Sequence, residues 1–189
     1  EGVAPDERWP VLLARALRHQ GIPLDDPRII ATTGWTTDEL WAAMDAAAPL
    51  GEWDCVSLLV GVNDQYRGRG VDDYRAGFHA LLERAIGIAG GNTPRVLVLS
   101  IPDWGATPFG AASGRDLAQV SREIDAFNAT AETLCERHGV SFVDVTGLSR
   151  ERGGEPAMLV GDGLHPSAAM YRLWTERALP CALNLLADA

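Results

Sequence analysis

Short runs of apolar residues alternate along the chain with longer segments in which apolar residues recur at helical spacing. The short runs are typical of buried strands, and the periodic segments are typical of helices with one face on a core. We therefore predict strands at Arg28–Thr33, Cys55–Val60, Arg95–Ser100 and Val140–Val145. The predicted helices cover Trp9–Gln20, Thr37–Ala48, Asp72–Ala89, Gly114–His138 and Pro166–Ala187.

The predicted strands are almost continuously apolar, which is typical of a parallel sheet that is covered on both faces. Alternation of strands and helices predicts an α/β fold, a three-layer α/β/α sandwich with a flavodoxin-like parallel sheet. The sequence contains no linker, internal repeat or low-complexity tract, so we expect a single domain over residues 1–189.

The beginning of the pattern is unusual, because the first predicted element is a helix that no strand precedes. Glu1–Trp9 is rich in Gly, Pro and acidic residues and predicts a loop. In a doubly wound sheet this helix follows a parallel strand, usually the central one. We therefore expect the first central strand to lie upstream of Glu1, in an N-terminal segment of roughly ten to twenty residues.

The net charge and the lengths of the apolar runs limit the kinds of molecule that the protein is expected to bind. The formal net charge of −10 disfavours nucleic acid and anionic membrane surfaces. The longest apolar runs fall short of the roughly 20 residues of a membrane span. No signal peptide is visible, and we expect a cytoplasmic protein, with periplasmic or secreted locations left open. The sequence gives no indication of oligomeric state.

Three short motifs follow the predicted strands: Gly34 in Thr-Thr-Gly-Trp-Thr-Thr, Asn63 in Gly-Val-Asn-Asp, and Asp162 with His165 in Asp-Gly-Leu-His-Pro. Each motif alone is weak evidence for a functional site. A lone Gly after a strand usually forms a turn, an Asn-Asp pair usually forms a turn or a helix cap, and a single His usually belongs to an ordinary loop. The carboxyl ends of parallel strands share one edge of the sheet, where ligands bind in such folds. The three motifs together are therefore stronger evidence for a functional site than any one of them.

These residue types supply complementary parts of one reaction. His165 can take a proton from a serine hydroxyl and return it to a leaving alcohol, while Asp162, three residues earlier, can orient the ring. The Gly34 backbone N–H and the Asn63 amide can donate hydrogen bonds to a tetrahedral oxyanion.

Gly-Val-Asn-Asp and Asp-Gly-Leu-His-Pro resemble two conserved blocks of the SGNH (GDSL) hydrolase superfamily, and Gly34 lies at the position of another. The chain is similar to small bacterial GDSL-type esterases over nearly its whole length. This resemblance implies a serine carboxylic ester hydrolase with a Ser-His-Asp triad acting on short- to medium-chain esters, without a cofactor. Gly34 and Asn63 would complete its oxyanion hole.

The Gly-Asp-Ser block that carries the nucleophile in this superfamily is absent from the sequence. Ser57 and Ser141 fall inside predicted strands, and Ser167 is placed to cap the last helix. We therefore expect the nucleophilic serine to lie upstream of Glu1, together with the first strand.

Apolar residues on the same loops suggest a substrate pocket, although ordinary packing would explain them equally well. The long loop Pro102–Gly114 contains no amphipathic lid, which favours soluble esters over lipid interfaces. The candidate pocket residues are Trp35, Val62, Trp104, Phe109 and Leu164.

Competing functions have less support in the sequence. A metal site needs three or four ligands, and the histidines other than His165 fall on predicted helices. The three cysteines have no zinc-site spacing, and no phosphate-binding glycine motif is present. A non-catalytic binding domain of the same fold remains an alternative, as do thioesterase and carbohydrate O-acetylesterase activities.

Overall fold

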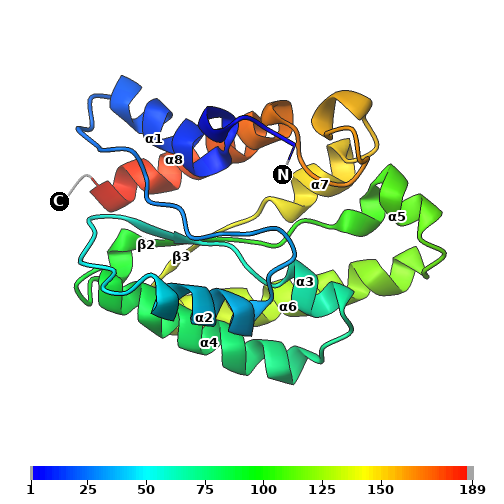
Figure 1. The fold of residues 1–189 in the computed structure, drawn as a ribbon, viewed down its shortest axis with the longest axis horizontal. Coiled ribbons are helices and arrows are strands. Elements are labelled where there is room, and N and C mark those ends of the chain that lie inside the picture. Colours follow the sequence, from blue (N-terminus) through cyan, green and yellow to red (C-terminus); the bar gives the residue numbers. More distant parts are fainter. Residues whose placement is uncertain (1, 187–189) are drawn as a thin grey trace.

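A parallel sheet of three strands forms the centre of the computed structural model, which describes residues 2–186 (Figure 1). The sheet order is β1-β2-β3, and its register aligns Val56 with Val96 and Leu97 with Ser141. Each strand lies within a segment that the sequence predicts, so the parallel α/β class is confirmed. The strands are β1 (Val56–Leu58), β2 (Val96–Leu99) and β3 (Ser141–Val143).

Helices cover both faces of this sheet and complete the predicted three-layer sandwich. Figure 1 shows α1 and α8 on one side and α2, α4 and α6 on the other. The five predicted long helices are all present, as α1 (Trp9–His19), α2 (Thr37–Ala46), α4 (Val71–Ile88), α6 (Leu117–His138) and α8 (Ala168–Leu186).

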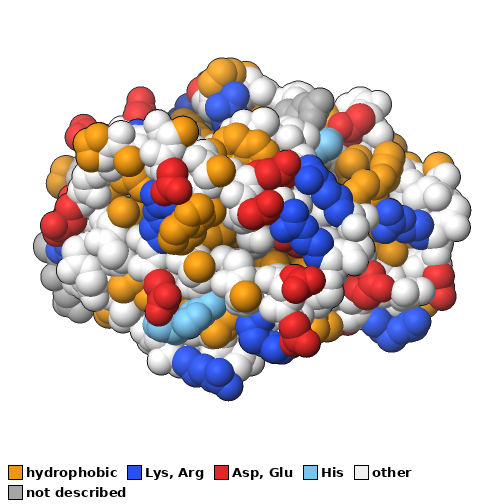
Figure 2. Space-filling model, turned by 60° about the horizontal axis from the view of Figure 1, so that its bottom comes forward, with side chains coloured by type: hydrophobic (Ala, Val, Ile, Leu, Met, Phe, Trp, Pro, Cys, Tyr) orange, Lys and Arg blue, Asp and Glu red, His pale blue; other side chains and the backbone are white. Residues whose placement is uncertain are grey.

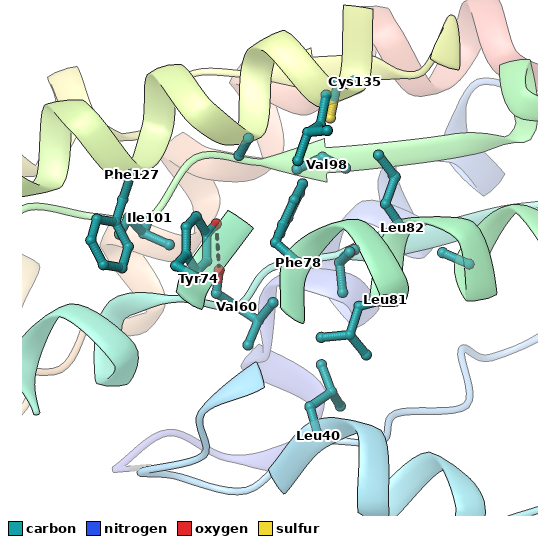
Figure 3. Close-up of a cluster of buried hydrophobic side chains, with 14 of the residues drawn as sticks. Leu40, Val60, Tyr74, Phe78, Leu81, Leu82, Val98, Ile101, Phe127 and Cys135 are labelled. Carbon is teal, nitrogen blue, oxygen red and sulfur yellow. Dashed lines mark hydrogen bonds between the residues drawn. The ribbon is translucent and has the colours of Figure 1, made fainter. Parts of the chain in front are cut away.

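Successive residues of β2 point into different layers, as the pleat of a strand requires. Val96 and Val98 lie in the core under α2, α4 and α6, and Leu97 and Leu99 lie in the core under α1 and α8. All four side chains are at most 2 % exposed. In Figure 3, Phe78 of α4 belongs to the first core and lies close to Val98. A sheet with two buried faces explains why the strand sequences are continuously apolar.

The end of β1 is fixed by a close contact with α4. The Tyr74 hydroxyl donates a hydrogen bond to the Val60 carbonyl at 3.2 Å (Figure 3). Gly61 follows at φ +130°, and a Cβ there would lie 2.6 Å from the Tyr74 ring. Only glycine therefore fits at this position. The contact sets the direction in which the chain leaves the sheet and enters α3 (Val62–Tyr66).

The strand predicted at Arg28–Thr33 is a wrong prediction. The segment contains no regular strand, although Ile30 packs against the core under α2 and α4. A strand is defined by its hydrogen-bonded neighbour, and within residues 2–186 the ladder consists only of β1, β2 and β3. The apolar pattern correctly indicated that the segment is partly buried, but it could not show whether the segment is hydrogen-bonded to a neighbouring strand.

Several short elements carry no periodic signal of their own and were not predicted. The last helix also begins later than predicted, because Pro166 forms an antiparallel bridge with Leu159. Ser167 caps this helix as expected, with its hydroxyl accepting from the Ala169 N–H at 3.2 Å; its predicted end, Ala187, lies outside the described residues. The unpredicted elements are α3, α5 (Pro108–Ala112), α7 (Thr146–Arg152) and the short 3₁₀ turns η1 (Pro5–Glu7), η2 (Thr93–Arg95), η3 (Trp104–Ala106) and η4 (Pro156–Met158).

Two glycines of α4 provide a matched test of how α2 packs on α4. A Cβ on Gly77 would lie 2.6 Å from the Thr37 hydroxyl, whereas a Cβ on the exposed Gly87 would meet nothing within 4 Å. We expect Gly77→Ala to lower stability by about 1–3 kcal/mol through overpacking. Gly87→Ala should raise it by about 0.5–1 kcal/mol, since alanine is the better helix former. Urea unfolding of both variants measures the difference, and equal effects would contradict this packing.

Candidate active site

A tight hairpin holds Asp162 and His165 between η4 and α8. The Val160 N–H donates to the His165 carbonyl at 2.9 Å, and the Gly163 N–H donates to the Val160 carbonyl at 3.0 Å. Gly163 adopts φ +66°, which lets the chain reverse at this point. The position of the His165 backbone is therefore set by local hydrogen bonds.

Asp162 contacts His165 through both of its carboxylate oxygens. Oδ1 accepts from the backbone N–H groups of Leu164 at 2.8 Å and of His165 at 3.0 Å. Oδ2 lies 2.6 Å from the His165 Nδ1 atom. The structure thus brings together the two residues that the sequence predicts as acid and base of a triad, in the orientation that a triad needs.

The charge of Asp162 determines the tautomer of the ring. Partial burial opposes ionisation, but hydrogen bonds from the His165 backbone, the His165 ring and the Leu164 N–H outweigh it and lower the Asp162 pKa to about 2. An ionised carboxylate only accepts hydrogen bonds, so His165 Nδ1 must carry a proton. In the neutral ring, Nε2 is then the basic nitrogen that can accept a proton from a nucleophile.

The two predicted oxyanion donors lie on neighbouring segments: Gly34 on the turn before α2, and Asn63 in the first turn of α3. The Asn63 Nδ2 atom donates to the Trp35 carbonyl at 2.9 Å, which orients the side-chain amide. Because an amide nitrogen has two hydrogens, this bond leaves one for an oxyanion. Gly34 occupies a turn closed by the bond from the Trp35 N–H to the Thr32 carbonyl, at 3.3 Å.

Asp64, the residue after Asn63, connects α3 to the start of α2. Its side chain is fully buried and accepts from the Thr37 hydroxyl at 2.8 Å and from the Thr37 N–H at 3.1 Å. Arg69 lies 3.3 Å from it and also pairs with Asp38 at 2.6 Å. Thr37 is the first residue of α2, so the carboxylate binds the positive end of that helix.

Burial raises the Asp64 pKa, and the Thr37 hydrogen bonds and the Arg69 charge oppose this rise. In the sequence Asp64 is only the last residue of the Gly-Val-Asn-Asp motif, and its contact with the start of α2 was not predicted. A single acidic residue beside Asn has no pattern that distinguishes a buried helix anchor from a turn residue. Burial and the partner Thr37, 27 positions earlier, come only from the tertiary structure.

The hairpin and the Asn63 helix are joined through α5. The Phe109 N–H donates to the Gly163 carbonyl at 3.1 Å. The Phe109 ring lies 6.4 Å from that of Tyr66, which ends the helix carrying Asn63. The hairpin that carries Asp162 and His165 and the helix that carries Asn63 are thereby joined through the Phe109 and Tyr66 rings.

The predicted pocket residues differ in how much surface they offer. Trp104 is only 3 % exposed, and its Nε1 atom donates to Gln65 at 2.7 Å. This residue can form the back of a pocket but presents little surface to a ligand. The other four are half-buried and pack against the core under α2, α4 and α6: Trp35, Val62, Phe109 and Leu164.

The described part of the chain contains neither a cluster of metal-binding side chains nor a membrane-spanning helix. Within residues 2–186, no group of three or more His, Cys, Asp or Glu side chains is arranged to hold a metal ion. None of the helices in this range combines the length and apolar character needed to cross a bilayer.

Comparison with known proteins identifies the architecture. A model of the GDSL-like lipase/acylhydrolase family matches residues 1–173, whereas no curated protein matches the sequence. The structure of TesA superimposes with a TM-score of 0.72 at 21 % identity, covering 98 % of this chain and 92 % of that one. An acetyl xylan esterase, AlAXEase, gives 0.71 at 15 % identity, covering 94 % and 91 %.

A lipase/acylhydrolase from Enterococcus faecalis gives a TM-score of 0.66 at 20 % identity, covering 92 % of this chain and 83 % of that chain. At such identities the likeness to these structures shows a common fold.

The lowered pKa of Asp162 predicts how the hairpin responds to acid. Its pKa is about 2 in the folded protein and 3.8 in the unfolded reference, so the ionised carboxylate stabilises the fold above about pH 4. This contribution is lost as the pH falls from about 4 to 2. We therefore expect the melting temperature of wild type to exceed that of Asp162→Asn at pH 6, with the gap closing towards pH 2.

Differential scanning fluorimetry across this pH range measures the gap. Asp25→Asn, at an exposed loop position, controls for the loss of one negative charge. A gap that stays constant from pH 6 to pH 2 would contradict the assigned ionisation.

Proposed function

Because the chain belongs to the GDSL-like lipase/acylhydrolase family, we propose that it is a hydrolase that cleaves short- to medium-chain carboxylic esters through a Ser-His-Asp triad. The observation that carries this proposal is the 2.6 Å contact between His165 Nδ1 and an Asp162 carboxylate. A carboxylate at Nδ1 both orients the ring and stabilises the imidazolium that forms during proton transfer.

In the proposed mechanism, His165 Nε2 removes the proton of a serine hydroxyl while the serine oxygen attacks the ester carbonyl carbon. The carbonyl oxygen becomes an oxyanion, which accepts hydrogen bonds from the Gly34 N–H and the Asn63 amide. The imidazolium then gives its proton to the leaving alcohol as the acyl–oxygen bond breaks. Water repeats the same steps on the acyl-enzyme and releases the acid.

The nucleophilic serine is proposed to lie upstream of Glu1. Support comes from the position of Gly2, where a Cβ would lie 2.7 Å from the Val160 side chain. Val160 begins the hairpin that holds Asp162 and His165, so the chain at Gly2 packs against that hairpin.

The aromatic group beside the hairpin is proposed to receive the substrate. Tyr66 is 37 % exposed and packs edge-on against the buried Trp104, with ring centroids 5.2 Å apart. With Phe109 it forms an aromatic wall, and the Arg115 guanidinium lies over the Tyr66 ring, 4.6 Å from its centroid. Such a wall suits an acyl chain or an aryl leaving group. The similar structures include acetyl xylan esterases and a lipase/acylhydrolase. Acetylated carbohydrates and thioesters therefore belong in the substrate panel beside p-nitrophenyl esters.

A fluorophosphonate probe tests the proposal, because it reacts covalently only with an activated serine. Protein produced with the segment that precedes Glu1 should be labelled and should hydrolyse p-nitrophenyl esters. His165→Ala should lose nearly all labelling and turnover while remaining folded, since the change removes the base but not the backbone hydrogen bonds of the hairpin. Mass spectrometry should locate the label upstream of Glu1.

Each alternative has its own outcome in this experiment. A folded wild type that is neither labelled nor active would identify a non-catalytic binding domain. A label on a serine within residues 1–189 would overturn the upstream position of the nucleophile.

The oxyanion role of Asn63 predicts a selective loss of turnover. Asn63→Ala should lower kcat by about 10²–10³ with little change in KM, because the oxyanion exists only in the transition state. Steady-state kinetics on a p-nitrophenyl ester give both constants. A decrease in kcat of less than about threefold would reduce Asn63 to a turn residue that holds Trp35.

A further inference from the structure

The turn from Thr32 to Trp35 carries the proposed donor Gly34, and we call it the oxyanion turn. Because glycine is flexible, residues outside this turn must hold its conformation. Gly34 adopts φ +92°, as the third residue of the turn from Thr32 to Trp35. Glycine has access to many backbone conformations, and no side chain of its own fixes the direction of its N–H. A donor that is to stabilise an oxyanion must already be in place before the reaction begins.

Arg67 supplies such a constraint. Its Nη2 atom donates to the Gly34 carbonyl at 2.6 Å. The same peptide unit is held at its other end by the bond from the Trp35 N–H to the Thr32 carbonyl. Holding both ends of this peptide restricts ψ of Gly34 and fixes where its Cα, and therefore its N–H, lies relative to the helix that carries Asn63.

The guanidinium of Arg67 is in turn oriented by Glu39. Its Nη2 lies 3.2 Å from Glu39 Oε2, and its Nη1 donates to Oε1 at 3.3 Å. Glu39 Oε2 also accepts from the Thr36 N–H at 2.8 Å, which fixes the carboxylate at the start of α2. Hydrogen bonds from the Thr36 backbone and hydroxyl, followed by Arg67, lower the Glu39 pKa and keep it ionised.

The ion pair itself is a poor source of stability. The side chains of Arg67 and Glu39 are 46 % and 40 % exposed, and pairs with such exposure contribute little to folding. Arginine and acidic side chains lie next to one another over much of the face that Figure 2 shows. Arg67 differs from an ordinary surface arginine because it also binds the backbone of the proposed oxyanion turn.

We propose that Arg67 is a positioning residue for the oxyanion hole, which acts by holding the Gly34–Trp35 peptide. The inference rests on the proposed function, because it assigns Gly34 as a donor. In this role Arg67 acts through Gly34 and Glu39, which it contacts, and not on the substrate itself. Its loss should therefore weaken binding of the transition state more than binding of the ester.

The test compares four variants in steady-state ester hydrolysis, using the protein that carries the segment before Glu1. Arg67→Ala should lower kcat by about tenfold or more with KM changed by less than about threefold. Arg67→Lys can still donate to the Gly34 carbonyl but lacks the planar fork that also binds Glu39, so it should recover part of kcat. Glu39→Gln retains the Thr36 contact and should fall between wild type and Arg67→Ala.

Arg75→Ala is the matched control. Arg75 is 51 % exposed and pairs with Asp72 within its own helix, so its removal should leave kcat and KM unchanged. The rate of phosphonylation by the fluorophosphonate probe gives a second readout, since that reaction also places an oxygen in the oxyanion hole. It should slow in Arg67→Ala in parallel with kcat.

Three results would overturn the inference. Arg67→Ala could match Arg75→Ala in kcat, it could change KM as much as kcat, or Arg67→Lys could fail to recover any activity although it keeps its melting temperature. A wild type that is folded but neither active nor labelled would instead overturn the proposed function, so the two failures are distinguishable.

Discussion

The buried carboxylate of Asp64 is the constraint on which the candidate site depends. A fully buried charge is tolerated only when its oxygens are hydrogen-bonded, and here the partners are the first turn of α2 and the side chain of Arg69. Satisfying Asp64 therefore fixes α2 against α3. Since Gly34 precedes α2 and Asn63 belongs to α3, the same interaction sets the distance between the two proposed oxyanion donors.

The two halves of the site are built in different ways. Asp162 and His165 are three positions apart, and their contact follows from hydrogen bonds within one hairpin. Gly34 and Asn63 are joined by contacts that cross 28 positions or more, through Trp35 and Arg67. The local half can form wherever the hairpin forms, whereas the non-local half exists only after the α2 and α3 regions have packed.

Long elements were predictable, because apolar periodicity accumulates over many residues. Helix α6 lies where the pattern places it, whereas the short strand β2 is identified by its continuous apolar run and not by a period. Helix α3 has only five residues, too few to show a period, and it was missed although it carries Asn63. The segment Arg28–Thr33 has the composition of a strand, but composition cannot supply the neighbouring strand that makes one.

By itself, the sequence determined the α/β class, the parallel sheet and the identity of the candidate residues. These follow from side-chain types and their order, which set hydrophobic burial and the chemistry that is available at strand ends. Only the tertiary structure decided that Asp64 is buried, that Trp104 faces the core, and that Arg67 binds the Gly34 carbonyl. Burial and hydrogen-bond direction depend on which distant segments meet, and no pattern along one segment contains that information.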